Sequence, residues 1–413
     1  MTRLTLCAFC LLGTSVCSAD DWPQWRGPNR SDVSNETGLL QSWPDGGPKR
    51  TWMSKEGGLG YSGFSVVGNQ VFTMGLEIDG DEEFVICLNA KDGSTSWKTG
   101  VAEKFANGWG DGPRCTPTIE GDHCYAMSGN GTLVCLSLTG GKEVWKKKMS
   151  DFGGGVPFWG YCESVLIDGD NLICTPGGKQ GAILALNKKT GETVWQSKDF
   201  TEGAQYSSVV KATINETPQY IQLTQKALVA VSPKDGSVIW RSDWEGRTAV
   251  IPTPIVRDNM IYISSGYNVG CKVVEISKDN KPSNVWQNKV MVNHHGGVIL
   301  KDDCLYGYCD GRKGGWTCQD LKSGEAVWND SKKLGKGAIA YADGKFYCLS
   351  EQKGEVVLLD ASKDGWKEGG RFTLSPQTEN RSPRGKIWVH PVIANGKLYL
   401  RDQELIYCYD VAK

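Results

Sequence analysis

Residues 188–195 read KKTGETVW, and variants of this phrase recur along the chain. Five of them share one spacing, with a glycine four residues before a tryptophan: Gly93 and Trp97, Gly141 and Trp145, Gly191 and Trp195, Gly236 and Trp240, Gly324 and Trp328. Each follows an apolar run typical of a buried strand, and a glycine supplies the positive φ that a tight turn requires. Each phrase therefore predicts a strand, a tight turn and a second strand that ends in tryptophan.

The spacing of the tryptophans reveals a repeat of about 45 residues, which Trp286 and Phe372 continue without the glycine. A second hairpin signature precedes each apolar run, as in VVGNQVFTM at 66–74 and IANGKLYLR at 393–401. Each repeat thus contains four short strands. A lone four-stranded sheet must stack on neighbours to bury its two faces, so this period is typical of a β-propeller blade.

The two ends of the chain predict how the ring closes. The last repeat stops at Lys413 without the strand that would carry its tryptophan, whereas Trp52 lies one period before Trp97. We therefore expect residues 48–54 to complete the final blade, which leaves no open sheet edge. The expected fold is all-β: an eight-bladed β-propeller of four-stranded antiparallel blades, closed by an N-terminal strand and spanning residues 48–413.

The N-terminal residues predict export. Residues 1–19 have one arginine, an apolar stretch and then small residues, which is the layout of a signal peptide. We expect a periplasmic or extracellular protein without a transmembrane segment, because no other stretch is long and apolar enough to span a membrane. Residues 20–47 are expected to form an extension that packs on the propeller, with Trp22, Trp25 and Trp43 covering the outside of the ring.

Charge and cysteines narrow the choice of ligand. The net charge is −1 without long runs of one sign, so a nucleic-acid partner is not indicated. One repeat position holds Cys87, Cys135, Cys318 and Cys408 or, in other repeats, Ala185, Ala230, Val274 and Leu358, and it is interpreted as apolar core. Two disulfides are considered, Cys124–Cys135 and Cys309–Cys318, as directly opposed pairs on adjacent strands. A haem or zinc ribbon is not supported, because the mature chain has no Cys-x-x-Cys.

Candidate binding residues lie in the junctions between the last strand of one blade and the first strand of the next, which deliver side chains to the axis. We call the face that carries these junctions the mouth. The expected binding residues are Trp109, Arg114, Trp159, Tyr161, Tyr206, Arg247, His294, His295, Arg384, Trp388 and His390. Their rings and cations would suit a planar or anionic ligand, although they could equally fill a wide axis. No metal site is predicted, since the adjacent His294 and His295 would point to opposite faces of a strand.

The phrase LNKKTGETVW at 186–195 resembles the tryptophan-docking motif of pyrroloquinoline quinone (PQQ) repeat propellers. That family includes quinoprotein alcohol dehydrogenases and a non-enzymatic lipoprotein of the outer-membrane β-barrel assembly machine. The resemblance covers residues 48–413, and DWPQWRGPNRSDVS at 21–34 is similar to the start of exported PQQ-like propeller proteins. The motif is specific for the architecture and not for an activity, because its tryptophans belong to blade packing.

Two classes of function follow from this resemblance. A PQQ- and calcium-dependent alcohol dehydrogenase would need a carboxylate base, for which Asp111 and Glu163 are candidates, and a planar platform such as Trp159 or Trp388. The vicinal disulfide, the haem motif and the long insertions of many such enzymes are missing from this sequence. We therefore favour an exported, non-catalytic scaffold that binds a protein or small-molecule ligand at the mouth, with the dehydrogenase as the alternative. Carbohydrate binding by the mouth aromatics is a third possibility.

Overall fold

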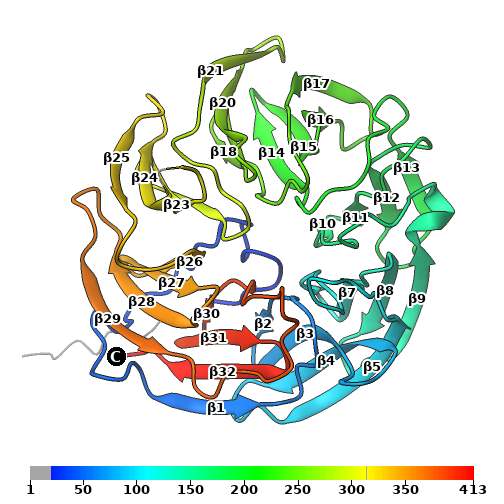
Figure 1. Cartoon of the computed structure of the whole chain (residues 1–413). Coiled ribbons are helices and arrows are strands. Elements are labelled where there is room, and N and C mark those ends of the chain that lie inside the picture. Colours follow the sequence, from blue (N-terminus) through cyan, green and yellow to red (C-terminus); the bar gives the residue numbers. More distant parts are fainter. Residues whose placement is uncertain (1–19, 313) are drawn as a thin grey trace, which may run out of the picture.

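The computed structural model describes residues 20–312 and 314–413, so the expected signal peptide, residues 1–19, lies outside the described residues. Thirty-two strands form eight four-stranded antiparallel sheets, which stand as blades around a ring (Figure 1). Within the described residues the only helical element is the short 3-10 helix η1 (Met149–Phe152). The expected all-β, eight-bladed propeller is confirmed.

The strands follow each other from the axis outward in every blade. Blades 1 to 4 consist of β2 (Ser65–Val67), β3 (Gln70–Leu76), β4 (Glu82–Asn89) and β5 (Thr95–Glu103); β6 (Thr118–Glu120), β7 (His123–Met127), β8 (Thr132–Ser137) and β9 (Glu143–Lys148); β10 (Leu166–Asp168), β11 (Asn171–Cys174), β12 (Leu184–Asn187) and β13 (Thr193–Gln196); and β14 (Val210–Ile214), β15 (Thr217–Leu223), β16 (Ala227–Val231) and β17 (Val238–Asp243). Blades 5 to 8 consist of β18 (Ile255–Arg257), β19 (Met260–Ser265), β20 (Gly270–Ile276) and β21 (Pro282–Asn288); β22 (Val298–Lys301), β23 (Cys304–Cys309), β24 (Gly315–Asp320) and β25 (Ala326–Asp330); β26 (Gly337–Ala342), β27 (Lys345–Ser350), β28 (Glu355–Asp360) and β29 (Glu368–Thr373); and β30 (Val392–Ala394), β31 (Lys397–Asp402), β32 (Leu405–Asp410) and β1 (Arg50–Ser54).

Strand β1 closes the ring as expected. It pairs antiparallel with β32 and places Trp52 opposite Cys408 and Met53 opposite Tyr407. In Figure 1 the blue strand β1 runs along the red β32 on the outer side of blade 8. Because strands from the two ends of the chain share one sheet, opening the ring would break this pairing.

The repeated glycine and tryptophan connect neighbouring blades. The Nε1 of Trp97 donates a hydrogen bond of 2.9 Å to the carbonyl of Leu138 in the next blade, and Trp145 does the same at 3.0 Å to Lys188. The glycine of the next blade lies against the same ring, so that a Cβ on Gly191 would come within 2.9 Å of the Trp145 ring. The glycine is therefore required both for its positive φ of 69° and for this close approach.

Blades 7 and 8 are joined to their neighbours in different ways. In blade 7 the position that the tryptophan takes in other blades is held by Gly370, opposite Leu358, so the expectation that Phe372 continues the tryptophan repeat is wrong. Phe372 lies two residues further on and packs against Gly47, where a Cβ would lie 2.5 Å from the ring. Trp52 of β1 donates to Ala90 of blade 1 at 2.8 Å. Trp240 differs, since its Nε1 donates to the side chain of Gln219 in its own blade at 2.6 Å. The closing blade is thus joined to both neighbours by aromatic side chains, as the interior blades are.

The expected cysteine core is confirmed and the expected cysteine pairs are wrong. Cys87, Cys135, Cys318 and Cys408 are buried, and each lies opposite the blade's tryptophan. In blade 5 Val273, and not Val274, takes this position opposite Trp286. In the inner hairpins of blades 2 and 6, Cys124 lies opposite Leu136, Cys135 opposite Tyr125, Cys309 opposite Gly315 and Cys318 opposite Tyr306. All twelve cysteines of the described residues are free thiols.

The segment before β1 runs inside the ring before it reaches the outside. Trp22 forms a bridge with Val66 of the innermost strand of blade 1, and Val33 bridges Tyr341 of the innermost strand of blade 7. Figure 1 shows this blue segment looping across the middle of the ring. Only Trp43 lies on the outer side, where its amide bonds to Gly369 of β29 at 2.8 Å. The expectation that Trp22 and Trp25 cover the outside is wrong, because residues 22–33 occupy the axis.

Candidate functional site

Two sets of loops meet at the mouth. Antiparallel strands reverse direction at each turn, so the turn between the second and third strands of a blade lies at the same end as the junction to the next blade. The mouth is therefore built from eight junctions and from the turns after β3, β7, β11, β15, β19, β23, β27 and β31. The glycine turns of the repeated phrase lie at the opposite end.

A cavity of about 340 Å³ lies at the centre of the mouth, and we call it the cup. Its volume falls within the range of about 300 to 1,000 Å³ that is usual for small-molecule sites. The cup is lined by Trp25, Arg26, Tyr61, Trp109, Arg114, Trp159, Cys162, Ser164, Tyr206, Thr248, Ile251, Pro252, Thr253, Tyr267, His294, His295, Gly297, Trp388 and His390. Eight of the expected binding residues are therefore brought together: Trp109, Arg114, Trp159, Tyr206, His294, His295, Trp388 and His390.

Three expected binding residues do not line the cup. Tyr161 is buried in the wall behind it, where its hydroxyl donates to the carbonyl of Pro176 at 2.9 Å. Arg247 is exposed and lies outside the lining. Arg384 lies at the rim, with its guanidinium 5.7 Å from the centre of the Trp109 ring.

The two candidate catalytic carboxylates are engaged elsewhere. Asp111 pairs with Lys104 at 3.0 Å and accepts a hydrogen bond from the amide of Asn107 at 2.8 Å, which holds its own loop. Glu163 is buried between blades 3 and 4, where it accepts hydrogen bonds from the amide of Thr175 at 2.6 Å and the amide of Val209 at 3.3 Å. Burial raises the pKa of Glu163 to about 7, although these donors and the nearby Arg30 act in the opposite direction. Neither carboxylate reaches the cup.

The N-terminal segment forms the floor of the cup. Arg26 binds Asp32 at 2.6 Å and the carbonyl of Val298 in blade 6 at 2.6 Å. The Nδ1 of His390 contacts the same carboxylate at 3.1 Å, and its Nε2 contacts the carbonyl of His295 at 2.9 Å. Trp25 packs on His390 with ring centres 4.6 Å apart. The cup is consequently closed at its base by buried, mutually paired charges.

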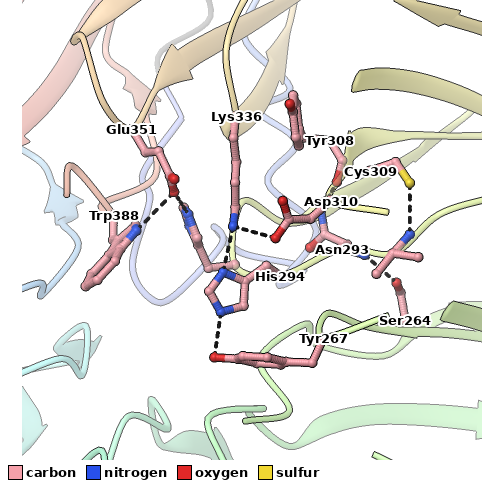
Figure 2. Close-up of polar contacts among 12 residues, drawn as sticks. Ser264, Tyr267, Asn293, His294, Tyr308, Cys309, Asp310, Lys336, Glu351 and Trp388 are labelled. Atoms are coloured by element: carbon pink, nitrogen blue, oxygen red, sulfur yellow. Dashed lines mark hydrogen bonds and ion pairs between the residues drawn. The ribbon is translucent and has the colours of Figure 1, made fainter. Parts of the chain in front are cut away.

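One wall of the cup carries a chain of polar contacts that crosses three blades. In Figure 2, Lys336 reaches both Asp310 at 2.8 Å and the Nδ1 of His294 at 2.9 Å, and the Nε2 of His294 points to the hydroxyl of Tyr267 at 3.0 Å. Burial lowers the pKa of His294 well below its usual range, and the neighbouring His295 and Lys336 lower it further. A neutral ring that accepts from the ammonium must then donate from Nε2 to the Tyr267 oxygen.

A second polar group stands beside this chain. The Nε2 of His295 is hydrogen-bonded to Glu351, which also accepts from the Nε1 of Trp388 at 3.0 Å (Figure 2). Burial lowers the pKa of His295 although Glu351 opposes this. Burial would raise the pKa of Glu351, but its bonds to His295 and the charge of Lys336 bring it below the ordinary value. The ionised Glu351 thus holds a neutral His295 and the Trp388 ring in place.

Several residues at the cup were not expected from the sequence. Tyr267, Asp310 and Glu351 belong to turns between second and third strands, which share the mouth with the junctions, and the direction of the strands could have indicated them. Lys336 lies in a junction whose position the repeat predicts. Within that junction, only its positive charge indicates a role at the mouth. Trp25 belongs to a segment without repeat period, and no sequence signal places it at the axis.

The residues present do not fit a calcium-held quinone. Calcium requires several oxygen ligands, usually carboxylates, and among the described residues the cup lining contains no Asp or Glu. No three His, Cys, Asp or Glu side chains within 20–312 and 314–413 are grouped as metal ligands. The nearby carboxylates are bound to Lys336, His295, Arg26 and His390. What the lining offers is aromatic surface and a few hydrogen-bonding groups.

Known proteins share sequence similarity with this chain. The family described as outer membrane protein assembly factor BamB matches residues 81–330. The factor of that name from Salmonella typhimurium is 24% identical over 338 residues, covering 75% of this chain and 75% of that protein. The one from Kangiella koreensis is 25% identical over 152 residues, and the match spans 37% of this chain and only 35% of that protein.

Solved structures agree on the fold. The quinohemoprotein alcohol dehydrogenase from Comamonas testosteroni superposes with a TM-score of 0.62 at 11% identity, covering 94% of this chain and 80% of that one. At this identity the likeness concerns the propeller alone. No helix of the described residues is long and apolar enough to cross a membrane. By its match over more than half of its length, this chain belongs to the PQQ-like β-propeller family described as outer membrane protein assembly factor BamB.

Proposed function

We propose that this chain is an exported, non-catalytic scaffold that binds a protein partner at the mouth of the propeller. The observation that carries this proposal is an aromatic surface beside the cup, formed by Trp109, Phe158, Trp159 and Arg384, which we call the rim patch. Phe158 is 76% exposed and Trp109 is 37% exposed, although both are large apolar side chains. Exposed aromatic residues with an arginine are typical of the residues that dominate protein interfaces.

The rim patch is preorganised. Phe158 and Trp159 meet edge to face with ring centres 4.7 Å apart, and Trp109 packs on Trp159 at 5.8 Å. The side chain of Asn107 donates to the carbonyl of Phe158 at 3.0 Å, and the hydroxyl of Tyr61 donates to that of Trp109 at 2.6 Å. Because the loops are already fixed, a partner would not bear the entropic cost of ordering them.

The state of the acid and base groups supports a binding role over catalysis. A general base must reach the proton of its substrate, but Glu351, Asp310 and Asp32 are each occupied by a cationic or hydrogen-bonding side chain. Of the two carboxylates expected from the sequence, Glu163 is turned into a blade interface and Asp111 is paired with Lys104. These contacts stabilise the mouth and leave its carboxylates without access to a substrate.

The names of the relatives suggest a location and a class of partner. The matching proteins are named outer membrane protein assembly factors, and a scaffold with an exposed aromatic patch suits work of that kind. We place the protein outside the cytoplasm, after removal of residues 1–19, with a component of outer-membrane assembly as its partner.

Binding experiments with rim variants test the scaffold role. An Asp in place of Phe158 would put a charge in the centre of an apolar contact, so we expect Phe158→Asp to weaken binding about 30-fold, the loss typical of a hot-spot residue. The control is Val194→Asp, a matched change at a 50% exposed apolar residue on outer strand β13. A partner is first captured from an outer-membrane extract, then purified and titrated against both variants.

Two results would contradict the scaffold role. One is equal affinity of Phe158→Asp and Val194→Asp for the purified partner. The other is enzymatic: PQQ and calcium retained after desalting, with turnover of short alcohols that Glu163→Gln or Asp111→Asn abolishes. That second result would favour the dehydrogenase.

A further inference from the structure

We infer that the cup is a carbohydrate site, which takes a neutral saccharide ring below the rim patch. The cup shares Trp109 and Trp159 with the rim patch, whereas Phe158 and Arg384 of the rim patch do not line it. The inference therefore goes beyond the scaffold role and can fail without it. It depends on the shape of the walls, on the hydrogen-bonding groups they present and on the charge of the lining.

The aromatic walls of the cup are inclined to one another. Tyr61 and Trp388 meet at 48°, Trp25 and His390 at 53°, and Trp109 and Trp159 at 62°. A puckered sugar ring carries C–H groups on several sides, so it can pack against faces set at different angles.

The polar wall presents one acceptor and one donor. His295 is buried at the cup, its Nε2 is occupied by Glu351, and its Nδ1 has no partner within 20–312 and 314–413. A neutral ring that donates from Nε2 has a lone pair on Nδ1, which requires a hydrogen-bond donor. Tyr267 accepts from His294, and its own hydroxyl proton is then available to a ligand.

Hydroxyl groups satisfy these requirements, because one hydroxyl can donate to a lone pair and another can accept from a phenol. A carboxylate or phosphate would leave the Nδ1 lone pair facing a negative charge. A cation would find no carboxylate in the described lining. The remaining lining groups, among them Thr248, Thr253 and Ser164, are hydroxyls that suit the same kind of ligand.

Arg114 fits this assignment. Its guanidinium donates to the carbonyls of Gly110, at 2.7 Å, and Gly112, and it lies 4.8 Å from the centre of the Phe105 ring. Two of its donor groups are thus used inside the protein. The three N–H groups that remain can donate to sugar hydroxyls.

The test is a titration of the purified protein with small probes. Maltose, cellobiose, lactose and chitobiose represent neutral saccharides, digalacturonate an acidic one, and indole-3-acetate a planar anion. We expect at least one neutral disaccharide to change tryptophan fluorescence saturably and to bind in calorimetry, at least tenfold more tightly than digalacturonate or indole-3-acetate. Silence of all four neutral sugars, or a preference for either anion, overturns the inference.

Variants locate the binding. Tyr267→Phe removes one hydroxyl and is expected to weaken the sugar about fivefold, the effect of one neutral hydrogen bond. The matched control is Tyr308→Phe, a change of the same kind at a residue outside the lining. Trp388→Ala is expected to weaken the sugar at least tenfold, and its thermal melt shows whether it folds; if it does not, Tyr267→Phe decides alone.

The rim variant separates the two proposals. Phe158→Asp should weaken the protein partner far more than the sugar, because Phe158 packs on Trp159 but does not itself line the cup. Equal sugar binding by wild type, Tyr267→Phe and Tyr308→Phe would show that the sugar binds elsewhere and would overturn the cup assignment. If the protein binds the sugar but no protein partner, the carbohydrate site is supported and the scaffold role is not. If the protein binds a partner but no sugar, the scaffold role is supported and the carbohydrate site is not.

Discussion

Buried ionisable side chains form hydrogen bonds that connect adjacent blades. Glu83 accepts hydrogen bonds from the amides of Phe105 at 3.0 Å and Gly129 at 2.9 Å, and Glu163 binds strand ends of blades 3 and 4. Arg401 donates to Ser62, Met74 and other groups between blades 8 and 1. Burial lowers the pKa of Arg401 to about 9 and raises that of Glu83 to about 7. These residues satisfy backbone groups where the strands of a blade end.

Glu163 should make stability depend on pH. Its pKa is about 7 in the folded protein and near the ordinary 4.5 when unfolded, so unfolding releases a proton between these values. The free energy of unfolding therefore falls as the pH rises through this window, by up to about 3 kcal/mol. Glu163→Gln has no such proton, so the stability of wild type relative to this variant should fall by that amount from pH 4.5 to 8. Urea unfolding at several pH values measures the difference.

An exposed carboxylate provides the control for this titration. Glu245 lies on the surface, and Glu245→Gln should give a stability difference that hardly changes with pH. If the Glu163→Gln difference is equally constant, the proposed proton uptake by Glu163 is wrong.

At the scale of elements, the blade-to-blade contact depends on the glycine of the repeated turn. Gly140 and Gly141 are adjacent, and both have positive φ, of 78° and 65°. A Cβ on Gly140 would meet nothing within 4 Å, whereas one on Gly141 would lie 2.7 Å from the Cδ2 of Trp97. This pair separates the cost of the backbone conformation from the cost of displacing the neighbouring tryptophan.

We expect Gly140→Ala to destabilise the protein by about 1 kcal/mol, the cost of a left-handed conformation for alanine. Gly141→Ala should cost about 1 to 3 kcal/mol more, because the added methyl group displaces the Trp97 ring. Urea midpoints of the two variants give the comparison. In a Trp97→Ala background the extra cost of Gly141→Ala should become smaller, since only the contact with the Oγ1 of Thr99, 2.6 Å from the added Cβ, remains. An extra cost of unchanged size there would argue against the contact with Trp97 as its cause.

At the scale of the whole molecule, ring closure joins the two ends of the chain. Trp52 of β1 and Trp195 of β13 are equally buried, each 8% exposed, and both donate to a carbonyl of the next blade, at 2.8 and 2.9 Å. The first belongs to the strand that closes the ring and the second to an interior blade. In a closed ring no blade is terminal, so the two positions are physically equivalent.

Trp52→Ala and Trp195→Ala should therefore destabilise the protein to a similar extent, about 3 to 5 kcal/mol each. Thermal and urea unfolding of both variants provide the measurement. A near-neutral Trp52→Ala beside a costly Trp195→Ala would mean that the N-terminal strand frays from blade 8 in solution.

The sequence indicated the parts of the site that follow the repeat. Junction residues such as Trp109, His295 and Trp388 were expected at the mouth because four antiparallel strands bring each junction to the same face. Tyr161 and Glu163 lie in a junction too, but their side chains point into the blades, and a junction has no period from which side-chain direction could be read. Tyr267 and Glu351 could have been included by applying the same strand geometry to the inner turns.

Other differences arose from local geometry. The pairing of Cys135 with Tyr125 instead of Cys124, and of Cys309 with Gly315, depends on the length of each hairpin turn. A register shift of one residue turns a side chain to the other face of the sheet. The apolar character of these cysteines was nevertheless evident from their repeat position, since Ala and Val occupy it elsewhere.

The order of amino acids was enough to specify the architecture: the blade, the number of blades and the strand that closes the ring. It could do so because stacking of similar units imposes the same residues at the same interval, and the interval is visible in one dimension. The folded molecule was needed to show that residues 22–33 close the axis and that Glu351, Lys336 and Asp32 arrange the histidines of the cup. Those contacts join segments that are far apart in the chain. Each contact occurs only once, so no repeated sequence pattern predicts it.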